Sequence, residues 1–317
     1  MLTRRSLLVM LAASPALIAT RKGGHAAQRL VETDQPETRL VLPNLASDRS
    51  YPTITFSSAA AYQGGAIRIS VDRAARGAAY VFGRTYILDP DGAGGAAGYI
   101  AFGTEDPPGP VLVSLDILEP GADWFSLSRE VTVLPTDWTV DYITLPPPEE
   151  PDPNAPPPPP PPPDETYLLP DIYAGVTPRK WTAGWHAPLD EPLSVTGYFG
   201  EQRSFNGGPV QGHHGGTDLG ANAGDPIYAT NDGVVVLSGL YLVRGNLIVV
   251  DHGSGVFSAY GHQSERVAQV GDYVSKGDVI GYVGTTGLST GPHLHWEMAV
   301  SGVLVDGLRW LDGSQGF

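Results

Sequence analysis

Short hydrophobic runs, separated by Gly, Pro, Asp and Asn turns, recur along most of the chain. In the first half they alternate with polar positions and are four to six residues long, as in 66–71, 79–82, 99–102 and 111–115. Short strands joined at regular intervals by such turns are typical of an antiparallel sandwich. The pattern therefore predicts an all-β chain in which residues 39–145 form an immunoglobulin-like β-sandwich.

A second set of predicted strands follows residue 168 and is richer in glycine. Its hydrophobic runs are 234–237, 246–250, 256–260, 279–283 and 293–299. No segment keeps a hydrophobic period of 3.6 residues over several turns, which argues against long helices. We therefore predict that residues 168–317 form a compact antiparallel β domain with few or no helices.

Between the two sets lies a proline-rich segment, 146–165, with eight consecutive prolines at 156–163. Proline fixes φ and removes a backbone donor, so the run favours polyproline II, which extends by roughly 3 Å per residue. We predict a semi-rigid linker here and a domain boundary on either side of it.

The first 27 residues have the pattern of an export signal. Arg4 and Arg5 precede an uncharged, largely apolar stretch from Ser6 to Thr20. A stretch of that length is short for a bilayer span, so a cleaved signal is predicted and no stable membrane span in the mature protein. The arginine pair fits the twin-arginine route and the general secretory route equally. Either route places the protein in the periplasm, the cell envelope or the extracellular space.

Charge and cysteine content restrict the possible partners and cofactors. The net charge is −15, which argues against nucleic acid as the main partner. The sequence has no cysteine, so a disulfide, a thiolate metal site and a cysteine nucleophile are all excluded. A metal ion would have to be held by histidine and carboxylate side chains.

Six of the eight histidines lie between His213 and His295. In a strand, His293 and His295 would point to the same face, with their Cα atoms roughly 7 Å apart. His214 and Asp218, four residues apart, would also share one side of a strand or extended loop. Two imidazoles and one carboxylate leave one position open on a four-coordinate zinc, which is the arrangement of a catalytic site.

Two further histidines are assigned other roles. His213 would point away from His214 in a strand, so solvent or support of the site is its expected place. His252 lies in the turn-like sequence Asp251-His252-Gly253, and we expect it to be structural.

Four ordered segments carry a family resemblance: TGYFGEQRSFNGG from Thr196, HHGGTDLGANAGDPIYATNDGVVV from His213, GNLIVVDHGSGVFSAYGH from Gly245 and VGDYVSKGDVIGYVGTTGLSTGPHLHWEM from Val270. Over residues 185–312 the chain resembles the lysostaphin-type (LytM-like) zinc endopeptidases of bacterial cell walls. The resemblance implies a small β domain with a groove, one zinc ion per chain and hydrolysis of peptide bonds in peptidoglycan.

The same resemblance assigns roles by matched position. His214, Asp218 and His295 would bind zinc. His262 and His293 would form a metal-free pair, one serving as general base and both stabilising the oxyanion.

These observations predict an exported zinc-dependent endopeptidase that cleaves peptidoglycan stems or cross-bridges. The alternative is a catalytically silent member that binds the wall or activates a wall amidase. Loss of a ligand would mark such a member, and here all five positions are filled. The bond cleaved, the role of the N-terminal half and the oligomeric state are left open by the sequence.

Overall fold

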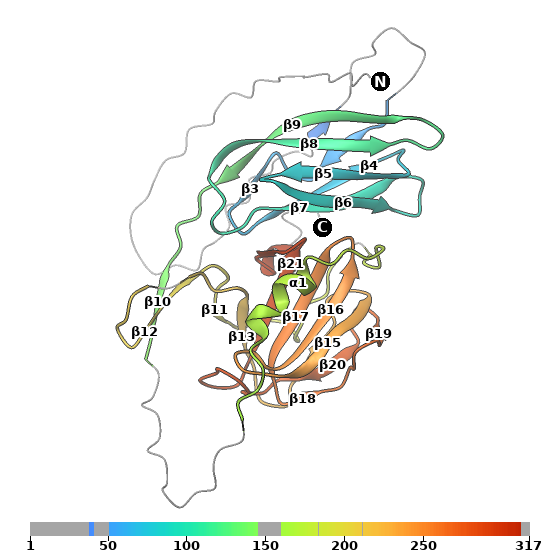
Figure 1. The fold of residues 1–317 in the computed structure, drawn as a ribbon. Helices are drawn as coiled ribbons and strands as arrows, with labels where there is room; N and C mark the ends of the chain where they lie inside the picture. Colours follow the sequence, from blue (N-terminus) through green and yellow to red (C-terminus); the bar gives the residue numbers. More distant parts are fainter. Residues whose placement is uncertain (1–37, 41–50, 145–159, 183, 211, 312–317) are drawn as a thin grey trace, which may run out of the picture.

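The computed structural model describes residues 38–40, 51–144, 160–182, 184–210 and 212–311, and these are almost entirely β (Figure 1). The predicted export signal, 1–27, and most of the predicted linker, 146–159, lie outside the described residues. Within the described ranges, no helix has both the length and the hydropathy needed to cross a bilayer.

The described N-terminal part consists of strands only. They are β1 (Thr38–Leu40), β2 (Ile54–Phe56), β3 (Ala60–Tyr62), β4 (Ala66–Val71), β5 (Arg76–Val81), β6 (Arg84–Pro90), β7 (Ala96–Ala101), β8 (Gly109–Leu118), β9 (Trp124–Leu134) and β10 (Val140–Ile143).

The first nine strands are hydrogen-bonded in the order β1-β2-β4-β7-β6-β5-β8-β9-β3. β6 joins two groups of strands, because it pairs along its length with β5 but meets β7 only at Asp89 and Pro90. Alternate side chains of β4 and β8, such as Ile69 and Leu115, are buried in one shared core. The predicted alternation is therefore confirmed for these strands, whereas β7, which contains most of the predicted run 99–102, is buried at every position. β3 pairs with β9 in the parallel direction.

The C-terminal part contains the remaining elements. They are a 3₁₀ turn η1 (Glu165–Tyr167), α1 (Leu169–Tyr173), β11 (Val195–Gly197), β12 (Gln202–Phe205), β13 (Thr217–Gly220), β14 (Pro226–Tyr228), β15 (Gly233–Tyr241), β16 (Gly245–Gly253), β17 (Val256–Gln263), β18 (Glu265–Arg266), β19 (Tyr273–Val274), β20 (Val279–Tyr282), β21 (His293–Val300), β22 (Val303–Val305) and α2 (Leu308–Leu311).

One sheet, in the order β11-β13-β21-β17-β16-β15-β19 with β22 added to β21, forms the body of this domain. A smaller sheet has the order β14-β20-β18. The helix α1 covers part of the large sheet, where Leu169 and Tyr173 pack with Leu247, Val249 and Phe257. The prediction of an antiparallel β domain with few helices is confirmed.

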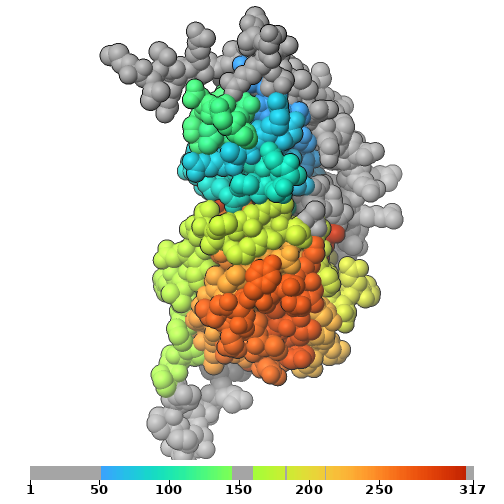
Figure 2. All heavy atoms as spheres, turned by 90° about the vertical axis from the view of Figure 1, so that its right-hand side faces the viewer, coloured from blue at the N-terminus to red at the C-terminus, as the bar shows by residue number. Residues whose placement is uncertain are grey.

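The two domains contact each other directly, as Figure 2 shows for the N-terminal strands and the C-terminal domain beside them. Tyr99 of β7 packs against Trp181 and Trp310, with ring centroids 4.9 and 4.7 Å apart, and all three side chains are almost fully buried. Ser254 also donates a hydrogen bond to Asp89, with an Oγ–Oδ2 distance of 2.7 Å. Aromatic side chains bury large areas, so this interface stabilises the observed arrangement of the domains.

After β9 the chain leaves the N-terminal sheets and joins the C-terminal domain. β10 pairs in parallel with β12, from Val140↔Gln202 to Ile143↔Phe205. Just before β10, the Trp138 ring lies on Gly200, where an added Cβ would be 1.9 Å from a ring carbon. Gly200 also has φ +81°, so both sterics and backbone conformation require glycine there. The predicted sandwich range thus ends with a strand that belongs to the other domain.

Candidate metal centre

Three of the predicted site residues meet at the junction of β13 and β21. These strands are antiparallel, and Asp218 lies directly opposite His295. His214 precedes β13, so it reaches the same point from an extended loop, one of the two conformations that the i, i+4 spacing allowed. Among the described residues, His214, Asp218 and His295 are the group whose ligand atoms could share one metal ion.

The ligand atoms form a compact triangle. Asp218 Oδ1 lies 3.1 Å from His214 Nε2 and 2.7 Å from His295 Nδ1, and the two nitrogens are 3.1 Å apart. Ligands bound to a tetrahedral zinc at about 2.0–2.1 Å would be about 3.3 Å apart. The triangle therefore needs only a small expansion to hold zinc, and the two-nitrogen, one-oxygen donor set suits that ion.

Hydrogen bonds on the far side of each imidazole fix which nitrogen faces the centre. His214 Nδ1 donates to the carbonyl of Tyr198 at 2.9 Å, which leaves Nε2 as the acceptor. His295 Nε2 donates to Glu297 Oε1 at 2.9 Å, which leaves Nδ1 as the acceptor that faces the centre. Outer partners of this kind hold a ligand ring in the tautomer and orientation that a metal requires.

The charge states of Asp218 and His214 suit a cation. Burial would raise the pKa of Asp218, but the neighbouring imidazoles of His214 and His295 outweigh it and hold that pKa well below its usual range. Burial lowers the pKa of His214, which favours the neutral ring. Burial alone would also lower the pKa of His295, but the adjacent carboxylates of Asp218 and Glu297 raise it, so a metal ion at Nδ1 would compete with a proton. Arg203 donates to the other oxygen of Asp218 at 2.7 Å.

His262 and His293 lie beside this group and outside it. Their ring centroids are 4.6 Å apart, and His262 is 5.8 Å from the ring of His295. His262 Nδ1 donates to the carbonyl of Thr286 at 2.7 Å, and His293 Nδ1 donates to that of Gly291 at 2.8 Å. Each ring therefore keeps Nε2 as a proton acceptor.

The environment keeps His262 neutral near pH 7. Burial, together with the nearby His295 and His293, lowers the pKa of His262 to about 3. His293 Nε2 lies 3.7 Å from Asp218 Oδ1, so the pair directly borders the candidate metal position. A neutral imidazole next to a metal centre can accept a proton from a bound or attacking water.

A cavity of about 330 Å³ opens onto these side chains. Asp218, His262 and His293 line it together with the loop 288–292 and residues of β10. Asp141 and Ile143 are the β10 residues that contribute to the wall. The strand that leaves the N-terminal domain therefore borders the candidate active site.

His213 and His252 lie away from the ligand atoms. The ring of His213 contacts Glu105, with Nε2 2.9 Å from Oε1. His252 lies near the end of β16 rather than in the turn itself, and it is fully buried, with Nε2 2.7 Å from Ser258 Oγ. Its structural role fits the prediction.

Sequence reasoning missed Arg203 and Glu297, which contact the ligands Asp218 and His295. The signal for Glu297 was present in the strand period, because a residue two positions after His295 lies on the same face. Nothing local to Arg203 pointed to its contact with Asp218.

The comparisons with known proteins agree with this geometry. Residues 212–307 match the profile of peptidase family M23. This segment is a peptidase M23 domain. It contains all five predicted site residues, His214, Asp218, His262, His293 and His295.

Relatives of the M23 segment include two proteins of Vibrio cholerae. The peptidoglycan DD-endopeptidase ShyA is 35% identical over 122 residues, which is 38% of this chain and 28% of ShyA. The peptidoglycan DD-endopeptidase ShyC is 41% identical over 144 residues, 44% of this chain and 33% of ShyC. The similarity thus spans a third or less of the length of either relative.

A crystal structure from Pseudomonas aeruginosa assigned to peptidase M23 resembles more of the chain. The superposition covers 79% of this chain and 94% of the other, with a TM-score of 0.56 and 23% sequence identity. At this identity the likeness concerns the fold. Because the superposition covers more residues than the M23 domain contains, the shared fold includes part of the N-terminal strands.

Proposed function

We propose that the protein is an exported, zinc-dependent endopeptidase that hydrolyses peptide bonds in peptidoglycan stems or cross-bridges. One observation carries the proposal: a His–Asp–His triangle of ligand atoms stands beside two histidines whose Nδ1 atoms donate to backbone carbonyls, which leaves each Nε2 free to accept a proton. Three protein ligands leave a fourth position open, which is the arrangement of catalytic zinc sites. One zinc ion per chain, held by His214, Asp218 and His295, is part of the proposal.

At such a site, zinc supplies a Lewis acid and lowers the pKa of bound water towards neutrality. The chain's own residues then handle the proton. One of the pair His262 and His293 accepts it at Nε2, while the Nδ1 hydrogen bonds to backbone carbonyls keep both rings aimed at the cavity. The ring that has taken the proton then stabilises the oxyanion of the substrate carbonyl by donating from Nε2.

The substrate class is supported by the relatives, whose names describe DD-endopeptidases of peptidoglycan. The cavity beside the two histidines has room for an extended peptide segment to approach the open zinc position. Export is supported by the arginine pair and apolar stretch at the start of the chain.

The N-terminal half, in our proposal, is an immunoglobulin-like sandwich separated from the peptidase by the proline-rich segment. The neighbouring strands β2-β4-β7 and β5-β8-β9 correspond in order to the A-B-E and C-F-G strands of that fold. The parallel pairing of β3 with β9 at the end of the sheet order is compatible with this assignment.

The test separates metal ligands from proton-transfer residues. Zinc content and hydrolysis of purified peptidoglycan are measured on the same preparations of three variants, His295→Ala, His293→Ala and His262→Ala. His295→Ala should lose both zinc and activity. The other two should retain near-stoichiometric zinc and lose about 10²–10⁴-fold in rate, as expected for a positioned acid–base group.

His186→Ala is the matched control, since its ring packs on Tyr228 and lies outside the candidate centre. It should retain zinc and activity. Activity in zinc-free protein would overturn the zinc mechanism. Loss of zinc in His293→Ala with retention in His295→Ala would reverse the assignment within the His-Leu-His pair.

A further inference from the structure

A chain of buried charged groups connects the candidate ligand His295 to the segment that follows the proline run. It passes from His295 to Glu297 of the same strand, then to Arg244 and finally to Glu165. The side chains of Glu165 and Glu297 are completely buried, and that of Arg244 is 14% exposed. Buried charges are costly unless they are paired and hydrogen-bonded, so a functional or structural reason is needed for this set.

Glu297 is the link nearest the metal centre. Its Oε1 accepts from His295 Nε2 at 2.9 Å and from Arg244 Nε at 2.8 Å. Its Oε2 accepts from the Tyr173 hydroxyl at 2.7 Å. With both oxygens engaged, the carboxylate has a fixed position, so the His295 ring is held with Nδ1 directed at Asp218.

Arg244 connects Glu297 to the other half of the site. It lies in the turn between β15 and β16, and its carbonyl accepts from the backbone N–H of His262 at 2.7 Å. His262 has φ +60°, an unfavourable conformation for a residue with a side chain, which surrounding contacts must stabilise. One arginine therefore contacts both the partner of a candidate ligand and the backbone of a candidate base.

Glu165 fixes Arg244 from the opposite side. Its carboxylate accepts from the backbone N–H of Arg244 at 2.6 Å and from that of Val243 at 3.3 Å. It also pairs with the Arg244 guanidinium at 3.5 Å. The buried glutamate thus binds both the backbone and the side chain of the same turn.

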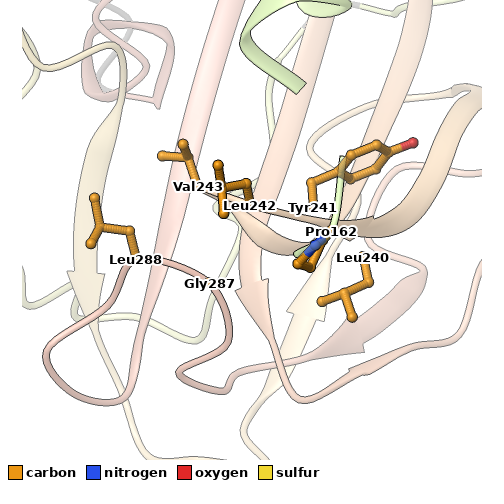
Figure 3. A pocket seen from close by; sticks show the side chains of 7 residues that line it. All are labelled: Pro162, Leu240, Tyr241, Leu242, Val243, Gly287 and Leu288. Atoms are coloured by element: carbon orange, nitrogen blue, oxygen red, sulfur yellow. The ribbon is translucent and has the colours of Figure 1, made fainter. Parts of the chain in front are cut away.

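The described end of the proline run holds Glu165 next to the turn between β15 and β16. Leu242 donates its backbone N–H to the carbonyl of Pro163 at 3.0 Å. Figure 3 shows Pro162 close to Leu240 and Tyr241, at the end of β15 that leads into the turn bound by Glu165. Residues 162–165 therefore pack on the M23 domain, although the sequence places them in a linker.

We propose that Glu297, Arg244, Glu165 and Tyr173 form a positioning network for the metal centre, and that the segment after the proline run is a working part of that centre. The inference rests on the proposed zinc site. The network holds His295 in the Nε2-protonated tautomer and supports the turn that carries the His262 hydrogen bond. Outer hydrogen bonds to a ligand typically change metal affinity by about 10–100-fold when they are removed.

The experiment uses the full chain with three nearly isosteric substitutions, Glu297→Gln, Glu165→Gln and Tyr173→Phe. Zinc affinity is measured by competition with a chromophoric chelator, and the visible absorption spectrum of the Co²⁺-loaded protein reports ligand geometry. Glu297→Gln should weaken zinc binding by about 10–100-fold and alter the Co²⁺ spectrum. Glu165→Gln and Tyr173→Phe should shift affinity in the same direction by smaller factors, since each acts through Glu297 or Arg244.

Asp251→Asn is the matched control for loss of a buried carboxylate. Asp251 accepts a hydrogen bond from Thr177 at 2.6 Å and lies 3.5 Å from Lys180. Neither partner belongs to the proposed network. A loss of stability is expected in this variant as in the others, but its zinc affinity and Co²⁺ spectrum should equal those of the unmodified chain.

The outcomes separate the network from the proposed function. An unmodified chain that binds no zinc would overturn the proposed metal site and with it the network. An unmodified chain that binds zinc, with folded variants of equal affinity and identical Co²⁺ spectra, would overturn the network alone. If circular dichroism shows that Glu297→Gln is unfolded, the same two measurements on Glu165→Gln and Tyr173→Phe decide the question.

Discussion

The buried neutral histidine His252 should make the metal-free protein sensitive to mild acid. Its Nδ1 donates to the carbonyl of Asp232 at 2.8 Å, and its ring meets Trp185 edge-on at 5.3 Å between centroids. Burial lowers the pKa of His252 from 6.5 to about 4, against the opposing effect of the Asp232 hydrogen bond. The folded protein therefore resists protonation at a position where the unfolded chain accepts a proton readily.

The direction and size of the effect follow from linkage. Between pH 6.5 and 4 the unfolded state binds more protons than the folded state, so stability falls as the pH is lowered through this window. A difference of 2.5 pH units at about 1.4 kcal/mol per unit corresponds to a loss of about 3 kcal/mol by pH 4, of which about 2 kcal/mol is lost by pH 5. Above pH 7 the contribution should be constant.

The assay compares the unmodified chain with His252→Asn, whose amide can still donate to Asp232 but does not titrate. The free energy of unfolding is measured by denaturant titration with tryptophan fluorescence, in the presence of a chelator, at pH 8, 5 and 4. The variant should be less stable at pH 8, and its disadvantage should shrink by about 3 kcal/mol at pH 4. The difference between the unfolding free energies of the two proteins at each pH cancels the contributions of all other titrating groups. Parallel pH profiles for the two proteins would refute the reasoning.

Three further predictions concern metal, domain packing and a glycine. A strong chelator should abolish peptidoglycan hydrolysis and added zinc should restore it; activity that survives complete removal of metal contradicts this. Proteolysis should cut between residues 146 and 159, yet the two halves should co-elute in native size-exclusion chromatography because Tyr99 is buried against Trp181 and Trp310; separate elution would show that this interface is weak. Gly200→Ala should lower the free energy of unfolding by about 1–3 kcal/mol, since φ is +81° and the new methyl group would overlap Trp138, and equal denaturation midpoints would contradict it.

Local pattern located nine of the twenty-two strands in the described residues, because alternation of hydrophobic and polar residues reflects one buried face and needs no knowledge of the partner strand. The run 66–71 coincides with β4, and 279–283 differs from β20 by one residue. Long strands with mixed polarity were harder: β9 was not predicted, since only three of its eleven residues, Leu127, Val131 and Val133, are buried.

The five site residues were also readable from the sequence, with the ligand and base roles coming from the family resemblance. The structure adds that His214, Asp218 and His295 meet within hydrogen-bonding distance, and that His262 and His293 stand beside them. Their assignment to zinc binding and proton transfer stays a prediction until the variants are measured.

The tertiary structure alone decided what surrounds those residues. Glu165 and Arg244 are 79 positions apart, and β10 meets β12 across a gap of about 60 residues, so no local period relates them. Glu165 falls in the segment predicted to be a linker, and no prediction was made for Arg244. A buried carboxylate or strand edge without a hydrogen-bond partner destabilises the fold. In this chain the partners come from groups that are distant in the sequence and close in the tertiary structure. Sequence pattern therefore determined the strands and the candidate ligands, whereas long-range packing determined which charged groups and which strand border the metal centre.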